Sequence, residues 1–200
     1  QNIMICYPPA KKETKLVITD DIFDFKDAFS SGNAYITEIE IEEGIQTIPS
    51  YAFNCLPNVE VITIPTTVTK IGEYLFDYEC NLQTVNYNAV DCNAKYAFNG
   101  LYNLTTINFG SEVKTVSDSM FASCGSLENI NFNGSIEFIY PYAFAYTPWH
   151  ENIQACDDGE IVYVDKVAYC SNNPTGSVEI KDGTKSIYAD AFSYSENLTS

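Results

Sequence analysis

The stretch that decides the fold is residues 59–82, with the sequence VEVITIPTTVTKIGEYLFDYECNL. Residues 61–64 fit a short β-strand in which successive side chains point alternately to a buried face and to an exposed face. Further on, Ile71 stands five residues before Phe76. One unit of this kind cannot enclose its own apolar side chains, so it predicts a strand that must be covered by neighbouring units.

The pattern recurs at a nearly constant interval along most of the chain. Seven phenylalanines, each preceded by a small or apolar residue, lie 24, 23, 22, 23, 23 and 48 residues apart. They are Phe29, Phe53, Phe76, Phe98, Phe121, Phe144 and Phe192. Most follow an apolar residue by five positions, and these residues are Ile48, Ile71, Val116, Ile139 and Ile187. In the third interval, which is one residue short, Asn93 stands there instead, and Val90 or Cys92 is expected to fill the position.

Repeats that each carry one strand predict a solenoid, because stacking buries between coils what a single coil leaves exposed. We therefore predict that residues 1–200 form one right-handed solenoid, with a short parallel strand in each coil of about 23 residues. The remainder is expected to be mostly β and irregular structure with short helical turns. The chain begins and ends partway through a repeat, which favours a fragment of a longer array.

The 48-residue interval requires a different unit. We predict that residues 145–176 form an elongated repeat containing a β-hairpin, because two alternating runs, 160–164 and 167–170, flank Asp165 and Lys166. The coil strand is expected to resume at residues 178–180. The amino terminus, where residues 4–7 precede the run 16–19, parallels the end of this elongated unit.

The charge excludes several functions. The chain carries 27 acidic residues against 10 lysines, with no arginine, for a net charge of −17. It would repel phosphate backbones and lacks the bidentate guanidinium used to read bases, so we predict no nucleic-acid binding. Anionic lipid is disfavoured for the same reason. No apolar run approaches the roughly 18 residues of a membrane span, so no direct membrane insertion is expected.

Side chains that carry chemistry are sparse, and we predict a non-enzyme without metal or cofactor. One histidine and seven cysteines without a Cys-x-x-Cys pair do not form a typical metal site. Cys55, Cys80 and Cys124 follow the repeat and are expected to face the core. Cys156 and Cys170 are the one pair considered for a disulfide.

His150 near Cys156 lacks a recognisable oxyanion hole or orienting partner, so a catalytic site is not expected there. The acidic turn 157–160 lacks EF-hand spacing, which favours a solvated turn over a weak calcium site.

The strand alternation also identifies the outward side chains, which stacking arranges in two columns on one sheet face. These candidate ligand-binding residues are Glu38, Glu40, Val61, Thr63, Thr84, Asn86, Thr106, Asn108, Asn129, Asn131, Ser177 and Glu179. Most are neutral. The alternative is a merely solvated face on which asparagines pair in ladders. At the amino-terminal end, Glu38, Glu40, Glu42 and Glu43 form an acidic corner, which a basic partner is expected to contact.

Tyrosines are the second candidate for an interface, since their amphipathic rings are favoured there. They recur two residues before or after the repeat phenylalanine, as Tyr51, Tyr74, Tyr78, Tyr96, Tyr142, Tyr146 and Tyr194. Packing against the neighbouring coil is the favoured role for most of them.

Residues 59–82 resemble the repeat of the BspA-type, or treponemal-type, leucine-rich repeat family, through Ile62-Thr63-Ile64-Pro65, Ile71-Gly72 and Cys80-Asn81-Leu82. Stretches of the elongated unit, such as 162–167 and 181–187, resemble that family's long repeat. The proline after the strand survives only as Pro65, and the cysteines are irregularly placed.

The resemblance implies a leucine-rich repeat solenoid that acts as a non-catalytic binding or adhesion module, secreted or at the cell surface. By the same resemblance its partner would be a host matrix or cell-surface protein, bound through the sheet face. A carbohydrate-binding module and a passive structural spacer are the alternatives.

Overall fold

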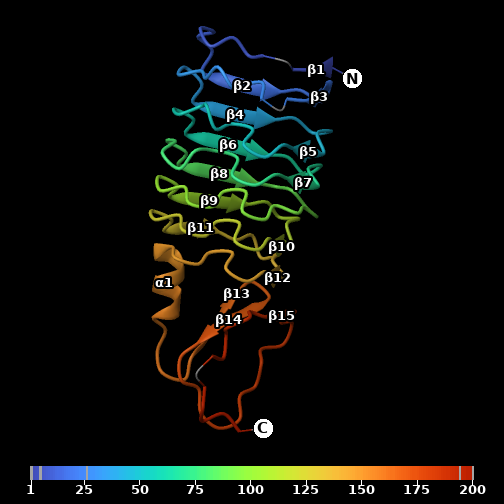
Figure 1. The fold of residues 1–200 in the computed structure, drawn as a ribbon. Helices are drawn as coiled ribbons and strands as arrows, with labels where there is room; N and C mark the ends of the chain where they lie inside the picture. The colour runs from blue at the N-terminus through green and yellow to red at the C-terminus, as the bar shows by residue number, and fades with distance from the viewer. Residues whose placement is uncertain (1, 5, 26, 194, 200) are drawn as a thin grey trace.

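The computed structural model describes residues 2–4, 6–25, 27–193 and 195–199, and its coils stack along one axis (Figure 1). Six strands form a parallel sheet in the order β11-β9-β8-β6-β4-β2. They are β2 Lys15–Ile18, β4 Glu38–Ile41, β6 Val61–Ile64, β8 Thr84–Tyr87, β9 Thr106–Phe109 and β11 Asn129–Asn131. The predicted solenoid with one short parallel strand per coil is confirmed in this part of the chain.

Register places equivalent residues of successive coils side by side. Ile39 pairs with Ile62, Ile62 with Val85, and Val85 with Ile107. All four side chains are fully buried, whereas their neighbours in the strands are half-buried on the outer face. The alternation read from the sequence is therefore the alternation between core and sheet face.

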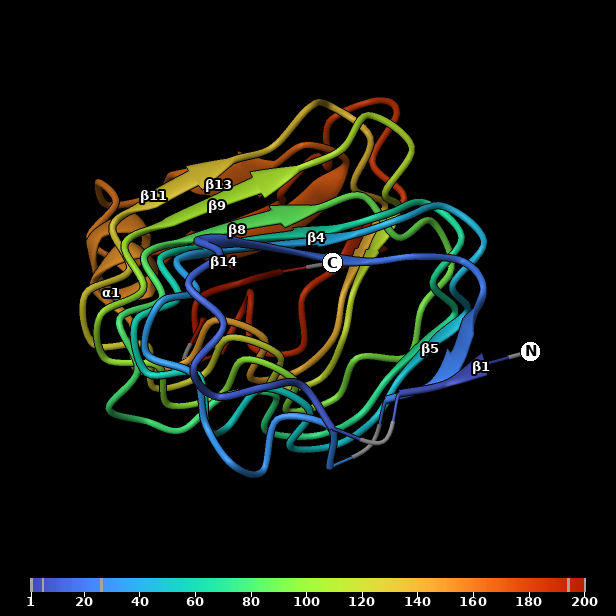
Figure 2. The ribbon, with the colours of Figure 1, turned by 90° about the horizontal axis from the view of Figure 1, so that it is seen from above.

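Shorter strands form a second ladder on another side of the coil, which is visible when the stack is viewed along its axis (Figure 2). β5 Thr47–Ile48 pairs with β7 Lys70–Ile71, and β10 Thr115–Val116 pairs with β12 Phe138–Ile139. Near the amino terminus, β1 Asn2–Ile3 pairs with β3 Ile22–Asp24. The coils are thus hydrogen-bonded to one another along two sides of the solenoid.

The repeat phenylalanines stack through the core. Ring centroids of Phe53 and Phe76 are 5.4 Å apart, and those of Phe98 and Phe121 are 5.3 Å apart with planes inclined by 7°. Phe121 and Phe144 continue the stack at 5.9 Å. Aromatic pairs in this range add roughly 0.5–1.5 kcal/mol beyond the burial of area. The period of the sequence is therefore the period of this aromatic column.

The residue two positions before each of six successive phenylalanines lies in the left-handed region of backbone space. These residues are Asp27, Tyr51, Tyr74, Tyr96, Ser119 and Tyr142, with φ between 51° and 62°. Tyrosine rarely adopts this conformation. Its recurrence shows that the turn into the phenylalanine is fixed by the coil geometry and not by a preference of the residue that occupies it.

The elongated unit contains a helix that the repeat pattern did not predict. Helix α1, Pro148–Gln154, begins after Thr147, whose Oγ1 accepts a hydrogen bond from His150 N at 3.1 Å. Thr147 before Pro148 is a recognisable helix start. Trp149 contacts the rings of Phe144 and Tyr169, with centroids 5.0 Å and 5.4 Å away. The helix therefore carries the aromatic column into the elongated unit.

A hairpin follows the helix. β13 Ile161–Val164 and β14 Val167–Ser171 pair in antiparallel orientation. The turn between them contains Asp165, whose φ is 49°. β14 then pairs in parallel with β15 Ser186–Ile187.

The predicted coil strand at residues 178–180 is absent from the described structure, so Ser177 and Glu179 do not extend the sheet face. In place of a strand parallel to β11, the preceding stretch forms α1 and the hairpin, which leaves residues 178–180 without a strand to pair with. Ile187, predicted to be a core residue, is 51% exposed on β15. No later coil among the described residues covers it.

Two coils approach closely at Gly72, and this predicts that a larger residue there destabilises the protein. A Cβ atom on Gly72 would lie 2.1 Å from Ser50 N, a backbone atom. We expect Gly72→Ala to lower the free energy of unfolding by about 1–3 kcal/mol, because the two coils must separate to admit the methyl group. Urea denaturation followed by circular dichroism measures this loss.

Gly125→Ala is the matched control, since its added Cβ would meet only Tyr102 Cδ1, at 3.6 Å. Its effect should stay within about 0.5 kcal/mol. Equal losses in the two variants would contradict the close approach at Gly72.

Candidate functional site

The sheet face holds two columns of outward side chains, as expected for ten of the twelve candidate residues. In the first column Glu38 aligns with Val61, then Thr84, Thr106 and Asn129. In the second, Glu40 aligns with Thr63, then Asn86, Asn108 and Asn131. The candidates thus form one continuous surface over five strands. The two that do not join it are Ser177 and Glu179, as described above.

An asparagine ladder runs along the second column. Asn131 Nδ2 donates to Asn108 Oδ1 at 2.6 Å, and Asn108 Nδ2 donates to Asn86 Oδ1 at 2.8 Å. Asn86 Nδ2 donates in turn to Thr63 Oγ1 at 3.2 Å. Each amide thereby fixes the orientation of the next. This ladder is the pairing that a merely solvated face would also form, and it orders the side chains of a surface that is only partly buried.

The amino-terminal end of the face is charged. Lys15 Nζ lies 2.8 Å from Glu38 Oε1 and 2.6 Å from Glu40 Oε2. The two carboxylates raise the pKa of Lys15. The acidic corner is therefore partly neutralised within the chain.

Glu43, also at this corner, binds the next coil. Its carboxylate accepts hydrogen bonds from Thr66 N at 3.1 Å, Thr66 Oγ1 at 2.8 Å and Thr67 N at 3.2 Å. These bonds, led by the one from the Thr66 backbone, lower the pKa of Glu43. Glu43 thus stabilises the turn at Thr66 and Thr67 and also contributes negative charge to the corner.

Two residues of the face were missed by the selection of candidates. β2 extends both columns, placing Lys15 beside Glu38 and Val17 beside Glu40. The signal was present in the apolar residues Leu16 and Ile18, which alternate with them and are buried. Val17 is 37% exposed, which adds an apolar side chain to the charged end.

Most repeat tyrosines on the other side of the coil pack against one another. Tyr74 stacks with Tyr51 at 6.1 Å and with Tyr96 at 6.0 Å, and its ring meets Tyr78 edge-on at 6.4 Å. This agrees with packing between coils. Tyr142 and Tyr146 are 57% and 74% exposed, and Tyr194 lies outside the described residues.

The cysteines are all free thiols, including Cys156 and Cys170. Cys124 is buried, and burial raises its pKa to about 12; burial also raises the pKa of Cys80. Cys55 is exposed, contrary to prediction. It follows its repeat phenylalanine by two residues, whereas the buried cysteines follow theirs by three and four, so it faces away from the core.

His150 belongs to the packing of the elongated unit. Its Nδ1 lies 2.7 Å from Tyr169 Oη, and burial lowers its pKa. Within the described ranges, no group of three histidine, cysteine, aspartate or glutamate side chains is arranged to hold a metal ion. No described helix is both long enough and apolar enough to cross a bilayer.

Stacked coils with one parallel strand each, an aromatic core column and an exposed sheet face define a leucine-rich repeat solenoid. The family described as the BspA type leucine-rich repeat region matches residues 25–153 in six copies. The chain therefore belongs to the BspA-type leucine-rich repeat family, as the resemblance predicted.

Solved structures of similar fold include a leucine-rich repeat protein from Eubacterium ventriosum. It has 22% identity and a TM-score of 0.52, over 71% of this chain and 45% of the other. A leucine-rich cell surface protein from Faecalibacterium prausnitzii has 19% identity and a TM-score of 0.46, over 95% and 47%. The pneumococcal vaccine antigen PcpA has 18% identity and a TM-score of 0.49, over 98% and 42%.

This chain spans less than half of each of these structures, and the similarity to the first establishes the fold alone. No curated protein matches the chain.

The asparagine ladder predicts a dependence of stability on Asn108. Asn108→Ala removes one donated and one accepted hydrogen bond, and we expect a loss of about 1–3 kcal/mol in the free energy of unfolding. Asn129→Ala, in the other column, removes an exposed side chain that makes no hydrogen bond among the described residues, and should cost under about 0.5 kcal/mol. Chemical denaturation compares the two. If the ladder contributed nothing to stability, the two variants would lose equal amounts of free energy of unfolding.

The bonds to Glu43 predict a pH dependence. A carboxyl whose pKa is lowered by folding stabilises the protein fully above its ordinary value of 4.5, and this contribution is lost as the pH falls through the lower folded value. We expect Glu43→Gln to reduce the drop in urea midpoint between about pH 6 and pH 3, compared with the unmodified chain. The exposed Glu60→Gln serves as control. An unchanged drop in Glu43→Gln would contradict the role of these bonds.

Proposed function

We propose that this chain is a non-catalytic binding module that recognises a protein partner through its sheet face. The observation that carries the proposal is the pair of aligned columns, continuous over five strands and neutral from Val61 to Asn131. Threonine and asparagine offer both donors and acceptors for hydrogen bonds across such a surface. Extended faces of this kind are the binding surfaces that solenoids use.

The neutral part of the face is the more favourable contact area. Because Lys15 already pairs with Glu38 and Glu40, a basic partner would have to compete with it at the acidic corner. On the neutral strands, no ion pair needs to be broken before contact. The net charge of the whole chain, −17, limits nonspecific association with other acidic molecules.

Family membership supports placing this module outside the cell, secreted or at the surface, as an adhesion component. A partner in host matrix or on a host cell surface is in keeping with that location. Family membership also supports a non-enzymatic role.

The proposal predicts that long, positively charged side chains placed on the columns weaken binding. A double variant, Thr84→Arg with Thr106→Arg, introduces two long side chains at adjacent positions of the first column. We expect binding to a panel of immobilised matrix proteins and to intact cells, followed by interferometry and flow cytometry, to fall by more than about tenfold.

The control is Ser31→Arg with Ser111→Arg, which adds the same charge at exposed turns outside the columns. It should bind as the unmodified chain does. Equal losses in both variants would indicate a charge effect and contradict the sheet face as the site. If the unmodified chain binds neither matrix proteins nor cells, the proposal fails.

A further inference from the structure

The short third repeat interrupts the second ladder of strands. Asn93 pairs in parallel with Lys70 of β7, but β10 begins a new pair with β12 instead of continuing from Asn93. This repeat is one residue shorter than its neighbours, so its backbone cannot keep register with the coils on both sides in the main sheet and in the second ladder alike. The shortage is absorbed between residue 93 and β10.

A side chain bridges the interruption. Ala94 N donates to Ser117 Oγ at 3.1 Å, and Ser117 Oγ donates to the Cys92 carbonyl at 3.2 Å. At equivalent places in the stack, backbone bonds connect coils directly, as from Tyr140 N to the Val116 carbonyl at 2.9 Å. The apolar position is filled by neither expected substitute: Asn93 aligns with Lys70, so the fully buried Ala94 takes the place of Ile71, while Cys92 is partly buried and Val90 is exposed. The Ala94 N–H and the Cys92 carbonyl are therefore both hydrogen-bonded at the break.

A groove of about 450 Å³ lies at this break. Asp91, Asn93 and Lys95 line it from the short repeat, and Thr115, Asp118 and Tyr140 line it from the next two coils. This volume falls in the lower part of the range of roughly 300–1,000 Å³ that is typical of small-molecule sites.

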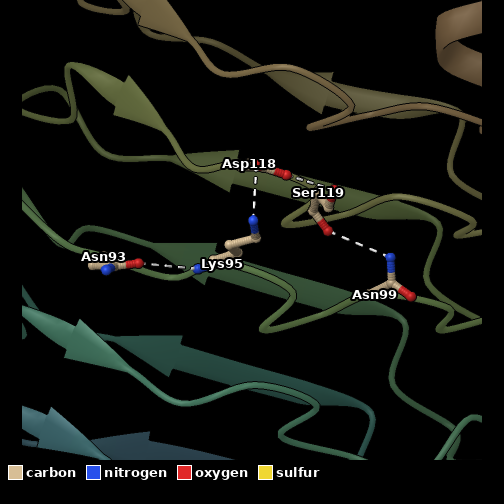
Figure 3. A network of polar contacts seen from close by, with 5 residues as sticks. All are labelled: Asn93, Lys95, Asn99, Asp118 and Ser119. Carbon is tan, nitrogen blue, oxygen red and sulfur yellow. Dashed lines mark hydrogen bonds and ion pairs between the residues drawn. The ribbon is translucent and has the colours of Figure 1, made fainter.

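Polar side chains in the groove are held in place by one another (Figure 3). Lys95 Nζ contacts Asp118 Oδ2 at 3.1 Å, and Ser119 Oγ donates to Asp118 Oδ1 at 2.7 Å. Asn93 Oδ1 accepts from Lys95 N at 3.4 Å. Among the described residues, Asn93 Nδ2 and the exposed Asp91 carboxylate have no hydrogen-bond partner. An oriented donor and an acceptor thus remain available to a ligand.

An aromatic ring borders these polar groups. Tyr140 is 46% exposed and meets Phe138 edge-on, with centroids 4.7 Å apart. That contact restrains the ring while leaving much of its surface open. A ligand with one apolar face and several hydroxyl groups would complement the combination of ring, carboxylate and amide.

We infer that the groove at the short repeat is a binding site for a neutral saccharide. A sugar hydroxyl both donates and accepts, so one hydroxyl can satisfy Asp91 and another Asn93, while the ring packs on Tyr140. Phosphate and sulfate are disfavoured by the Asp91 carboxylate, since Lys95 is already paired with Asp118, and no set of three metal-binding side chains occurs in the described chain. A basic peptide gains little, because Lys95 already neutralises Asp118. This site is separate from the proposed sheet face.

The test uses an array of neutral oligosaccharides with sialylated and sulfated counterparts, followed by calorimetric titration of the strongest neutral trisaccharide. We expect the chain to prefer neutral members. Tyr140→Ala and Asn93→Ala should each weaken binding by at least about tenfold, the loss expected when a packed ring or a ligand hydrogen bond is removed. Tyr102→Ala, which removes a 60% exposed tyrosine outside the groove, should leave the affinity unchanged.

Circular dichroism and the urea midpoint of each variant establish that it is folded. The Thr84→Arg with Thr106→Arg variant should retain saccharide binding, which separates this site from the sheet face. Absence of neutral-saccharide binding, preference for anionic members, or binding that survives Tyr140→Ala in a folded protein would each overturn the inference.

Discussion

Hydrogen bonding between successive coils is the constraint on which the rest of the structure depends. Parallel strands lie about 4.8 Å apart, so every residue stands close to its equivalent in the next coil. Side chains at equivalent positions must then be able to pack on one another. Phe53 and Phe76 do so in the core, Tyr51 and Tyr74 on one side, and Asn86 and Asn108 on the sheet face. Each column satisfies the same spacing between coils with a different kind of side-chain contact.

The same constraint explains why a one-residue change in repeat length has a large local effect. In the main sheet the register is kept on both sides of β8, because Val85 pairs with both Ile62 and Ile107. The shortage is displaced to the second ladder, where two-residue strands offer few bonds to lose. There it creates the groove between Asn93 and β10. A departure from the period thus places a distinct chemical environment on an otherwise repetitive surface.

Periodicity predicted the features that depend on spacing, and it failed where the chain leaves the repeat. The buried strand residues and the two columns followed from alternation alone, because one face must be covered by the next coil. The pattern did not reveal α1, since its start signal at Thr147 and Pro148 is local and carries no period. Ser177 and Glu179 were assigned to the face by analogy with earlier coils, but that assignment required a neighbouring strand which the hairpin replaces. Lys15 was missed because β2 precedes the first repeat phenylalanine.

The distribution of charge along the sheet face gives the solenoid a direction that its repeats alone do not have. Charged residues gather on β2 and β4, whereas the strands from β6 to β11 present neutral side chains joined by the ladder from Asn131 to Thr63. The first region is held by ion pairs that weaken with salt, and the second by neutral hydrogen bonds that do not. Recognition on the neutral strands would therefore depend on shape and hydrogen-bond pattern. The surrounding acidic surface would act mainly by excluding partners of like charge.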